Sequence, residues 1–402
     1  MTAVSARWRP VQRLVEACAL FGFSLPNGVH ASSAAPGTPS NYEVIFQTPW
    51  EEGVSEGLQH LEHIYLSIPT QAPAKKLYYD VLGFAPDARR LHNLQKGSGT
   101  IWANIGTSQI HLPEGEPQVV PGTIGLVYPD LTEVVSRLKG ERFDALDGTK
   151  FTWQKRSDDA LEVTCPYGNV LRLHQRAPVS ATNETTAPPP NSLDSRGGRL
   201  PNLSSAVGLG IAYAHFRVRP GTAAGLARFY REILGADVEE VGSEKSADEA
   251  TCSMVSLRIG LPVCDVSQQS VAQSARECSS FCDSQGSMTG GTFVRVGPAQ
   301  HLGFVETEEA LPEYDGHHIC LYMTDEGFRR SFLEAERRGL VFVNPRPSFG
   351  NADTLEKALD EKQYRIKNMV DPSTGDLLHV LEHEIRCISH PAYPVGRNVS
   401  ID

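Results

Sequence analysis

Two stretches of the chain follow one pattern, and this internal repeat restricts the possible folds more than any other feature. Residues 61–83, LEHIYLSIPTQAPAKKLYYDVLG, alternate at first, then turn and continue as an amphipathic segment that ends in Gly83. Residues 214–235, AHFRVRPGTAAGLARFYREILG, have the same order and end in Gly235. His63 precedes Gly83 by twenty residues, and His215 precedes Gly235 by the same number. Each copy is therefore predicted to be a strand, a loop, a helix and a glycine stop.

Two further segments have the same strand and helix pattern. They are TIGLVYPDLTEVVSRLKG, residues 123–140, and HHICLYMTDEGFRRSFLEAERRG, residues 317–339. A set of short predicted strands follows each of the four segments, for example TIWANIGTSQIHL, residues 100–112. The chain is therefore predicted to be an α+β protein of four βαβββ units, two in each half.

The composition changes sharply between the two halves. Residues 176–206 are rich in Pro, Ser, Thr and Asn and hold almost nothing that a core could bury, which is typical of an irregular, protease-sensitive linker. A second polar stretch resembles an insertion into a loop. The predicted organisation is a tail at 1–45, an N-terminal module at 46–176, a linker at 177–206, and a C-terminal module at 207–402 with a loop insertion near 260–292.

The first residues leave three interpretations open. Arg7, Arg9 and Arg13 come before any acidic residue, and a short apolar run with small residues follows. This pattern is compatible with an organelle transit peptide, a secretory signal or a disordered tail, and Glu16 inside the apolar run weakens the second. We expect a soluble protein that is either organellar, through this segment, or cytoplasmic.

Charge and cysteine content exclude several classes of partner. The chain has 37 Lys and Arg against 48 Asp and Glu, a net charge of −11, and no long basic run, so we expect no nucleic-acid partner. No apolar run approaches the length of a membrane span, so no membrane partner is expected either. The eight cysteines are scattered and are most simply explained as reduced, structural thiols.

With its four βαβββ units, the chain resembles the vicinal oxygen chelate superfamily, which includes glyoxalase I, extradiol dioxygenases and bleomycin-resistance proteins. The resemblance covers about residues 58–176 and 208–385. It implies two tandem modules whose curled mixed sheets enclose a cleft. It also implies metal ligands on the first and last strands of the units, pointing into that cleft. The ending LEHEIRCISHPAYPVGRN resembles a group of two-module members without an assigned activity.

Alternation predicts which histidines point into this cleft. His63 and His111 fall on ligand positions of unit one, and His318 and His379 fall on those of unit four. If units one and four share a cleft, as the resemblance to glyoxalase I implies, these four form the metal site. If each half closes on itself, as in the dioxygenases, the site is His215, His318 and His379 instead. The first pairing accounts for His111 and is favoured, but both stay open.

Such a site predicts a metal-dependent lyase, isomerase or oxidoreductase of glyoxalase or dioxygenase type. A divalent ion (Zn, Fe, Ni or Mn) on imidazoles would act as a Lewis acid on vicinal oxygens of a small oxygenated substrate. Tyr65, Tyr213 and Tyr364 are candidate acid–base groups. No glutamate falls on the four assigned positions, so neither family activity transfers unchanged. The alternative is a metal-free small-molecule-binding or scaffold protein that uses the same cleft.

Overall fold

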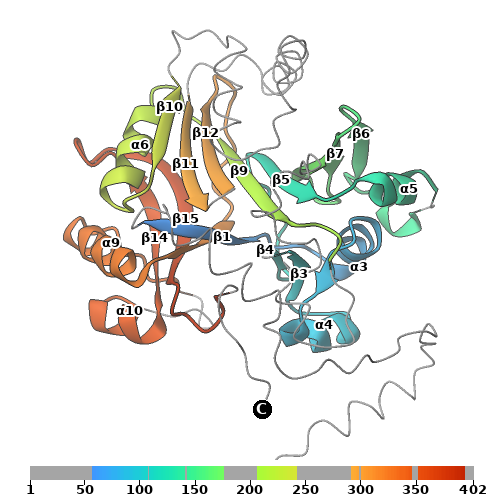
Figure 1. Cartoon of the computed structure of the whole chain (residues 1–402), viewed down its shortest axis with the longest axis horizontal. Coiled ribbons are helices and arrows are strands. Elements are labelled where there is room, and N and C mark those ends of the chain that lie inside the picture. Colours follow the sequence, from blue (N-terminus) through green and yellow to red (C-terminus); the bar gives the residue numbers. More distant parts are fainter. Residues whose placement is uncertain are drawn as a thin grey trace, which may run out of the picture. The chain divides into compact units, whose positions relative to one another are not determined.

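The computed structural model describes residues 57–106, 108–140, 143–175, 206–241, 291–297, 300–345 and 352–393 (Figure 1). The predicted tail, nearly all of the linker and nearly all of the loop insertion lie outside these residues. None of the described helices is both long and apolar enough to cross a bilayer.

The N-terminal half forms two βαβββ units. The first consists of β1 (Leu58–Tyr65), α3 (Gln71–Ala74) with the π-helical turn Lys75–Val81, β2 (Ala85–Pro86), the 3₁₀ turn Ala88–Arg90, α4 (Leu91–Lys96), β3 (Ile101–Ile105) and β4 (Ser108–Leu112). The second consists of β5 (Gly122–Tyr128), α5 (Thr132–Gly140), the 3₁₀ turn Asp144–Leu146, β6 (Thr152–Lys155), β7 (Ala160–Thr164) and β8 (Val170–Gln175). Both units have the predicted element order.

The C-terminal half repeats the plan with one variation. The third unit consists of β9 (Gly210–Val218), α6 (Ala223–Glu232), β10 (Val238–Val241), β11 (Gly291–Gly297) and β12 (Gln300–Glu306). The fourth consists of β13 (His318–Met323), α9 (Asp325–Arg337), α10 (Leu355–Glu361), β14 (Gln363–Val370) and β15 (Leu377–Cys387). In the fourth unit a single bridge between Val341 and Ile366 takes the place of the short strand that follows the helix in the other units.

The units combine across the two halves of the chain. Among the described residues there are two mixed sheets: a seven-stranded sheet in the order β14-β15-β13-β1-β4-β3-β2, and an eight-stranded sheet in the order β10-β11-β12-β9-β5-β8-β7-β6. The antiparallel pairs β1–β13 and β5–β9 are the two junctions. Units one and four therefore share one sheet and units two and three share the other, which is the pairing that the sequence favoured.

The helices cover one face of these sheets, as an apolar stripe predicts. In α9, Thr324 caps the first turn by accepting a hydrogen bond from the Gly327 amide, and Phe328, Phe332 and Ala335 are fully buried at helical spacing. Figure 1 shows α9 and α10 beside β14 and β15, and α6 beside β10 and β11. The opposite face of the seven-stranded sheet is thus left for polar side chains.

Candidate functional site

Two rows of polar side chains cross the seven-stranded sheet from β15 to β4. In one row Glu384, Cys320, His63 and Gln109 are register partners, and in the other row Glu382, His318, Tyr65 and His111 are. Register partners share a face of a sheet, and the two rows are two residues apart on every strand, so all eight side chains lie on the same face. Buried apolar residues on the alternate positions, such as Ile64 and Ile319, turn to the other face.

Three of these side chains converge on one point. The ligand atoms of His63, His318 and Glu384 lie within 4.8 Å of one another, and all three residues are buried. Glu384 Oε2 is 3.5 Å from His318 Nε2 and 3.9 Å from His63 Nε2. We call this group the His63–His318–Glu384 cluster. Two imidazoles and one carboxylate form a donor set that binds divalent transition metals.

Glu62 fixes the orientation of His63. Its Oε2 lies 2.8 Å from His63 Nδ1, and because the carboxylate can only accept, Nδ1 carries the hydrogen. His63 Nε2 is then a lone-pair donor, and it has no hydrogen-bond partner among the described residues although it is buried. Glu62 is held in turn by Arg386, 2.9 Å away. A carboxylate behind a histidine is the arrangement that orients metal ligands in proteins.

Two arginines keep Glu384 ionised. Arg365 donates to Oε2 at 2.5 Å, and Arg386 pairs with Oε1. Burial alone would raise the pKa of Glu384, but these guanidinium groups outweigh it and hold the pKa well below its usual range. A carboxylate has about four lone-pair sites, so each oxygen can accept from an arginine and still offer a lone pair to an ion.

Three carboxylates and two guanidinium groups lie around the cluster in the described part of the chain. Arg365 also pairs with Glu382 at 2.5 Å, so Glu62, Glu382 and Glu384 each pair with Arg365 or Arg386. Burial lowers the pKa of His318 to about 3 and also lowers that of His63, so the imidazoles are neutral. The cluster therefore presents two neutral imidazoles and one ionised carboxylate in a buried region, where charged groups are typically paired or bind metal ions.

His111 lies beside the cluster and does not converge with it. Its ring stacks on His63, with ring centroids 3.8 Å apart, and on Trp102 at 4.3 Å. Its Nε2 lies 3.0 Å from the carbonyl oxygen of the Gln109 side chain and donates to it. Burial, followed by the neighbouring His63, lowers the pKa of His111 well below its ordinary value. His111 thus supports the His63 ring from one side.

Tyr65 is the predicted acid–base residue that the structure brings to the cluster. Its ring stacks on His318, with centroids 4.2 Å apart, and is partly exposed whereas the cluster residues are buried. The other two tyrosines lie elsewhere. Tyr213 is in the eight-stranded sheet, where its hydroxyl is 2.9 Å from His174 Nε2. Tyr364 faces α9 and donates to the Ser331 hydroxyl at 2.7 Å, so it is a packing residue on the helix side.

His215 belongs to the other sheet. Its Nε2 is 2.8 Å from His301 Nε2, and both rings are buried beside Tyr213. His301 lies on β12, the last strand of the third unit, where it is the register partner of Tyr213. Burial lowers the pKa of both imidazoles. Since the two halves exchange units, His215 and His318 lie in different sheets, and the structure does not form the alternative set of His215, His318 and His379.

The structure also separates His379 from the cluster. Further along β15, His383 turns to the helix side: its Nδ1 donates to the Leu381 carbonyl, so its Nε2 accepts from the Tyr230 hydroxyl of α6 at 2.7 Å. Glu382 and Glu384 are the register partners of His318 and Cys320 and share their face of the sheet. A register irregularity of the β14–β15 pair lies between Val380 and His383, so simple alternation does not carry over from His379 to His383.

Sequence reasoning missed Glu384 and Glu62, although one signal was available. Leu381 and Ile385 alternate with Glu382 and Glu384, and in an amphipathic strand the apolar positions face the helices. The same rule that placed His63 would therefore have selected Glu384. Cys320 also lies with Glu62 and His63, and burial raises the pKa of its thiol well above its ordinary value.

Comparisons with known proteins gave solved structures alone, because no protein-family model and no curated protein matches this chain. Glyoxalase I from Zea mays is 12% identical, with 82% of this chain and 92% of that chain covered and a TM-score of 0.40. The cppA protein from Streptococcus pneumoniae is 10% identical, with 83% of this chain and 100% of that chain covered and a TM-score of 0.37. The 2,3-dioxygenase LapB from Pseudomonas is 13% identical, with 83% of this chain and 93% of that chain covered and a TM-score of 0.24.

The element order and the strand order together identify the fold. Each unit begins with a strand and a helix, and its remaining strands return beside the first. Units one and four, and units two and three, then join edge to edge through their first strands. The described residues therefore form four βαβββ units, as the internal repeat predicted, and these units pair across the two halves of the chain.

Proposed function

We infer that this chain is a metal-dependent enzyme that acts on a small oxygenated substrate at the His63–His318–Glu384 cluster. The observation that carries the proposal is the convergence of two neutral imidazoles and one ionised carboxylate within 4.8 Å of one another, all of them buried. His379, His215, Tyr213 and Tyr364 are left out of the proposed site, and Glu384 takes the place that the sequence gave to His379.

The donor set fits Fe, Zn, Ni or Mn and leaves coordination positions for a substrate, because only three side chains converge. A bound divalent ion would polarise a carbonyl or enolate oxygen as a Lewis acid. The chain's own residues prepare the site for this. Glu62 keeps the His63 lone pair directed at the cluster, and Arg365 and Arg386 hold the Glu384 carboxylate in place.

Tyr65 is the proposed proton-handling group. It stacks on His318 and is the partly exposed residue of its row, so its hydroxyl can meet a substrate that enters along the cleft. Stacking restricts the ring to one plane, which limits where the hydroxyl can donate or accept a proton. His111 and Trp102 form a stack on the far side of His63 and exclude water from that side.

Metal analysis tests the proposal. The full chain, prepared without a histidine tag, is incubated in turn with Fe(II), Zn(II), Ni(II) and Mn(II), dialysed and analysed by mass spectrometry. We expect about one ion per chain for at least one metal, and a loss of most of it in His318→Gln and Glu384→Gln. His92→Gln, an exposed histidine of α4, is the matched control and should keep the metal. Metal-free protein under all four conditions would leave the metal-free binding protein as the better hypothesis.

A further inference from the structure

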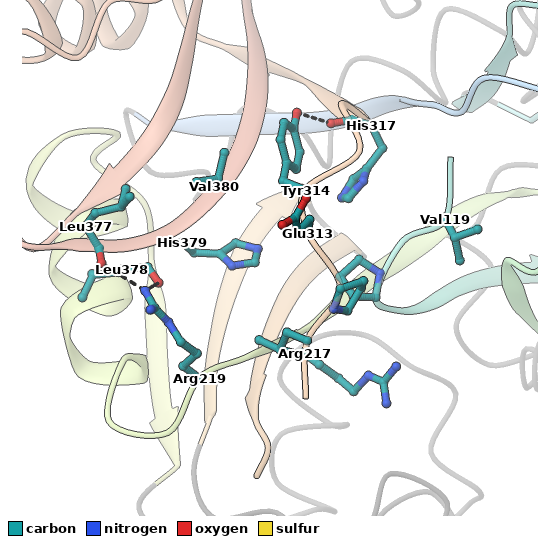
Figure 2. A pocket seen from close by; sticks show the side chains of 13 residues that line it. Val119, Arg217, Arg219, Glu313, Tyr314, His317, Leu377, Leu378, His379 and Val380 are labelled. Carbon is teal, nitrogen blue, oxygen red and sulfur yellow. Dashed lines mark hydrogen bonds between the residues drawn. The ribbon is translucent and has the colours of Figure 1, made fainter. Parts of the chain in front are cut away.

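A cavity lies away from the cluster. It has a volume of about 220 Å³ and is formed where the end of β9, the segment before β13 and the beginning of β15 meet the loop before β5 (Figure 2). His63, His318 and Glu384 are not among the residues that line it. His317 and His379 do line the cavity. His317 precedes His318 and turns to the other face of the strand, so neighbouring histidines serve two separate regions.

The walls of this cavity are mainly apolar. Val119, Leu311, Leu378 and Val380 approach it from three different segments of the chain. A concave apolar surface of this size with a few polar groups is the usual form of a small-molecule site. The body of a ligand with about five or six carbons would be in contact with these side chains.

Two imidazole nitrogens inside the cavity lack partners. The Nε2 atoms of His317 and His379 are buried and have no hydrogen-bond partner among the described residues. Figure 2 shows both rings directed into the cavity. His317 Nδ1 lies 2.6 Å from the Asp315 carboxylate and donates to it, so Nε2 is the ring nitrogen left for a ligand. Buried polar atoms without partners are rare, and a bound molecule that pairs with them would remove their cost.

Arg219 places a positive charge at the cavity. Its guanidinium donates to the carbonyls of Leu377 and Leu378, at 3.3 Å each, and no carboxylate pairs with it within the described part of the chain. The neighbouring Arg217 is instead paired with Glu309. Burial, together with His317 and Arg219, lowers the pKa of His379 to about 4, so His379 is neutral and can donate through Nε2. Arg219 therefore offers a cation to the cavity, and His317 and His379 each offer an imidazole nitrogen.

We propose that this cavity is a binding site for a small aliphatic 2-hydroxycarboxylate. The carboxylate accepts from Arg219 and from His379 Nε2, and the hydroxyl forms a hydrogen bond with His317 Nε2. The alkyl chain packs on Leu311, Leu378 and Val380. This proposal does not depend on the metal centre, because the lining residues are not those of the cluster.

Calorimetric titration of the full chain with 2-hydroxyhexanoate, hexanoate and 1-hexanol tests this site. Because a hydroxy acid can also chelate a metal, the titrations are repeated in the Glu384→Gln variant, where the cluster is disabled. We expect the same binding in both proteins, with 2-hydroxyhexanoate about tenfold tighter than hexanoate and hexanol weaker than either. Binding that disappears in Glu384→Gln would assign the ligand to the cluster and overturn the proposal.

Two variants locate the ligand in the cavity. Val380→Phe fills the space, and Arg219→Gln removes the charge from an exposed position where folding is not at risk. Each should weaken 2-hydroxyhexanoate by at least about tenfold, and Arg219→Gln should leave hexanol unchanged. Unaltered affinity for the hydroxy acid in Arg219→Gln, equal affinities for the two acids, or no heat with any of the three compounds up to about 20 mM would each overturn the proposal.

Discussion

Glu62 shows how much a single side chain contributes to the candidate metal site without joining it. Its carboxylate is 1% exposed and connects His63 Nδ1 to Arg386. The hydrogen on Nδ1 determines that Nε2 faces His318 and Glu384 as a lone pair. If Glu62 were absent, His63 could adopt either tautomer or rotate, and the three donor atoms would no longer converge.

Replacement of Glu62 by Gln tests this role. The glutamine still fits and hydrogen-bonds, but it no longer requires the hydrogen on Nδ1, so we expect metal affinity to fall by about 10–100-fold. Competition with a fluorescent chelator measures the change. Glu162→Gln is the matched control, because Glu162 pairs with Arg172 in the other sheet, and its affinity should match that of the wild type. Equal affinities in the two variants would show that Glu62 does not orient the ligand.

Between some elements, backbone lies so close to backbone that only a glycine fits at the contact. At the end of β3, Gly106 has φ +54°, and a Cβ there would lie 1.8 Å from the carbonyl oxygen of Leu209, just before β9. Backbone from the seven-stranded sheet therefore packs directly on backbone that leads into the eight-stranded sheet. The loop between β3 and β4, which sets the register of Gln109 and His111, depends on this contact.

Gly106→Ala should destabilise the protein by at least about 3 kcal/mol, because the left-handed conformation and a backbone clash are both involved. Gly97→Ala is the control, since Gly97 has φ +80° at the end of α4 but open space around its Cβ. Gly97→Ala should lower the free energy of unfolding by about 1 kcal/mol, which is the cost of the left-handed conformation alone. Urea unfolding measures both values. Similar losses for the two variants would mean that the contact with Leu209 relaxes without cost.

At the scale of the whole molecule, neither half of the chain forms a sheet by itself. The N-terminal half supplies β1–β4 to one sheet and β5–β8 to the other, and the C-terminal half completes both. The junction strands β1 and β5 are interior strands, hydrogen-bonded on both sides. Separation of the halves would leave β1 and β5 of one half, and β9 and β13 of the other, each with an unpaired backbone edge.

Separately expressed halves, residues 1–190 and 191–402, should therefore be poorly folded alone and should recover native structure when they are mixed. Near-ultraviolet circular dichroism and gel filtration follow this recovery. The intact chain cleaved between the halves is the control, and it should elute as one particle. Two halves that each unfold cooperatively on their own would contradict the shared-sheet arrangement, because each would then be an independent domain.

Buried neutral histidines should make the molecule sensitive to acid. Burial lowers the pKa of His301 to about 3 and that of His174 to about 4. Above about pH 6.5 these rings are neutral in both the folded and the unfolded state, and stability is unaffected. Below that pH the unfolded chain binds protons that the folded chain does not, so stability falls by about 1.4 kcal/mol per pH unit for each such ring.

We therefore expect the free energy of unfolding to decrease steadily from about pH 6.5 to pH 4, and His301→Gln to decrease less steeply than the wild type. Urea unfolding at a series of pH values gives both slopes. His92→Gln, at an exposed position, should follow the wild-type slope. Parallel curves for wild type and His301→Gln would show that His301 takes up its proton in the folded state as readily as in the unfolded one.

The sequence by itself determined the features that depend on neighbours along the chain. Period-two and 3.6-residue patterns are local, so the four units, the strand that carries His63 and the strand that carries His318 all followed from the printed residues. Alternation then placed His63 and Tyr65 on the cleft face. The same local rule, applied to Leu381 and Ile385, would have selected Glu384.

Only the tertiary structure decided what depends on partners far apart in the sequence. Whether unit one joins unit two or unit four is set by edge-to-edge hydrogen bonding between β1 and β13, more than 250 residues apart, and both pairings satisfy the same local pattern. The parallel register of β13 and β15 sets Glu384 opposite Cys320 and brings its carboxylate to His318, whereas His379 lines a different cavity. Alternation along β15 selects the face of Glu384, but the pairing of β15 with β13 decides which side chains Glu384 meets on that face.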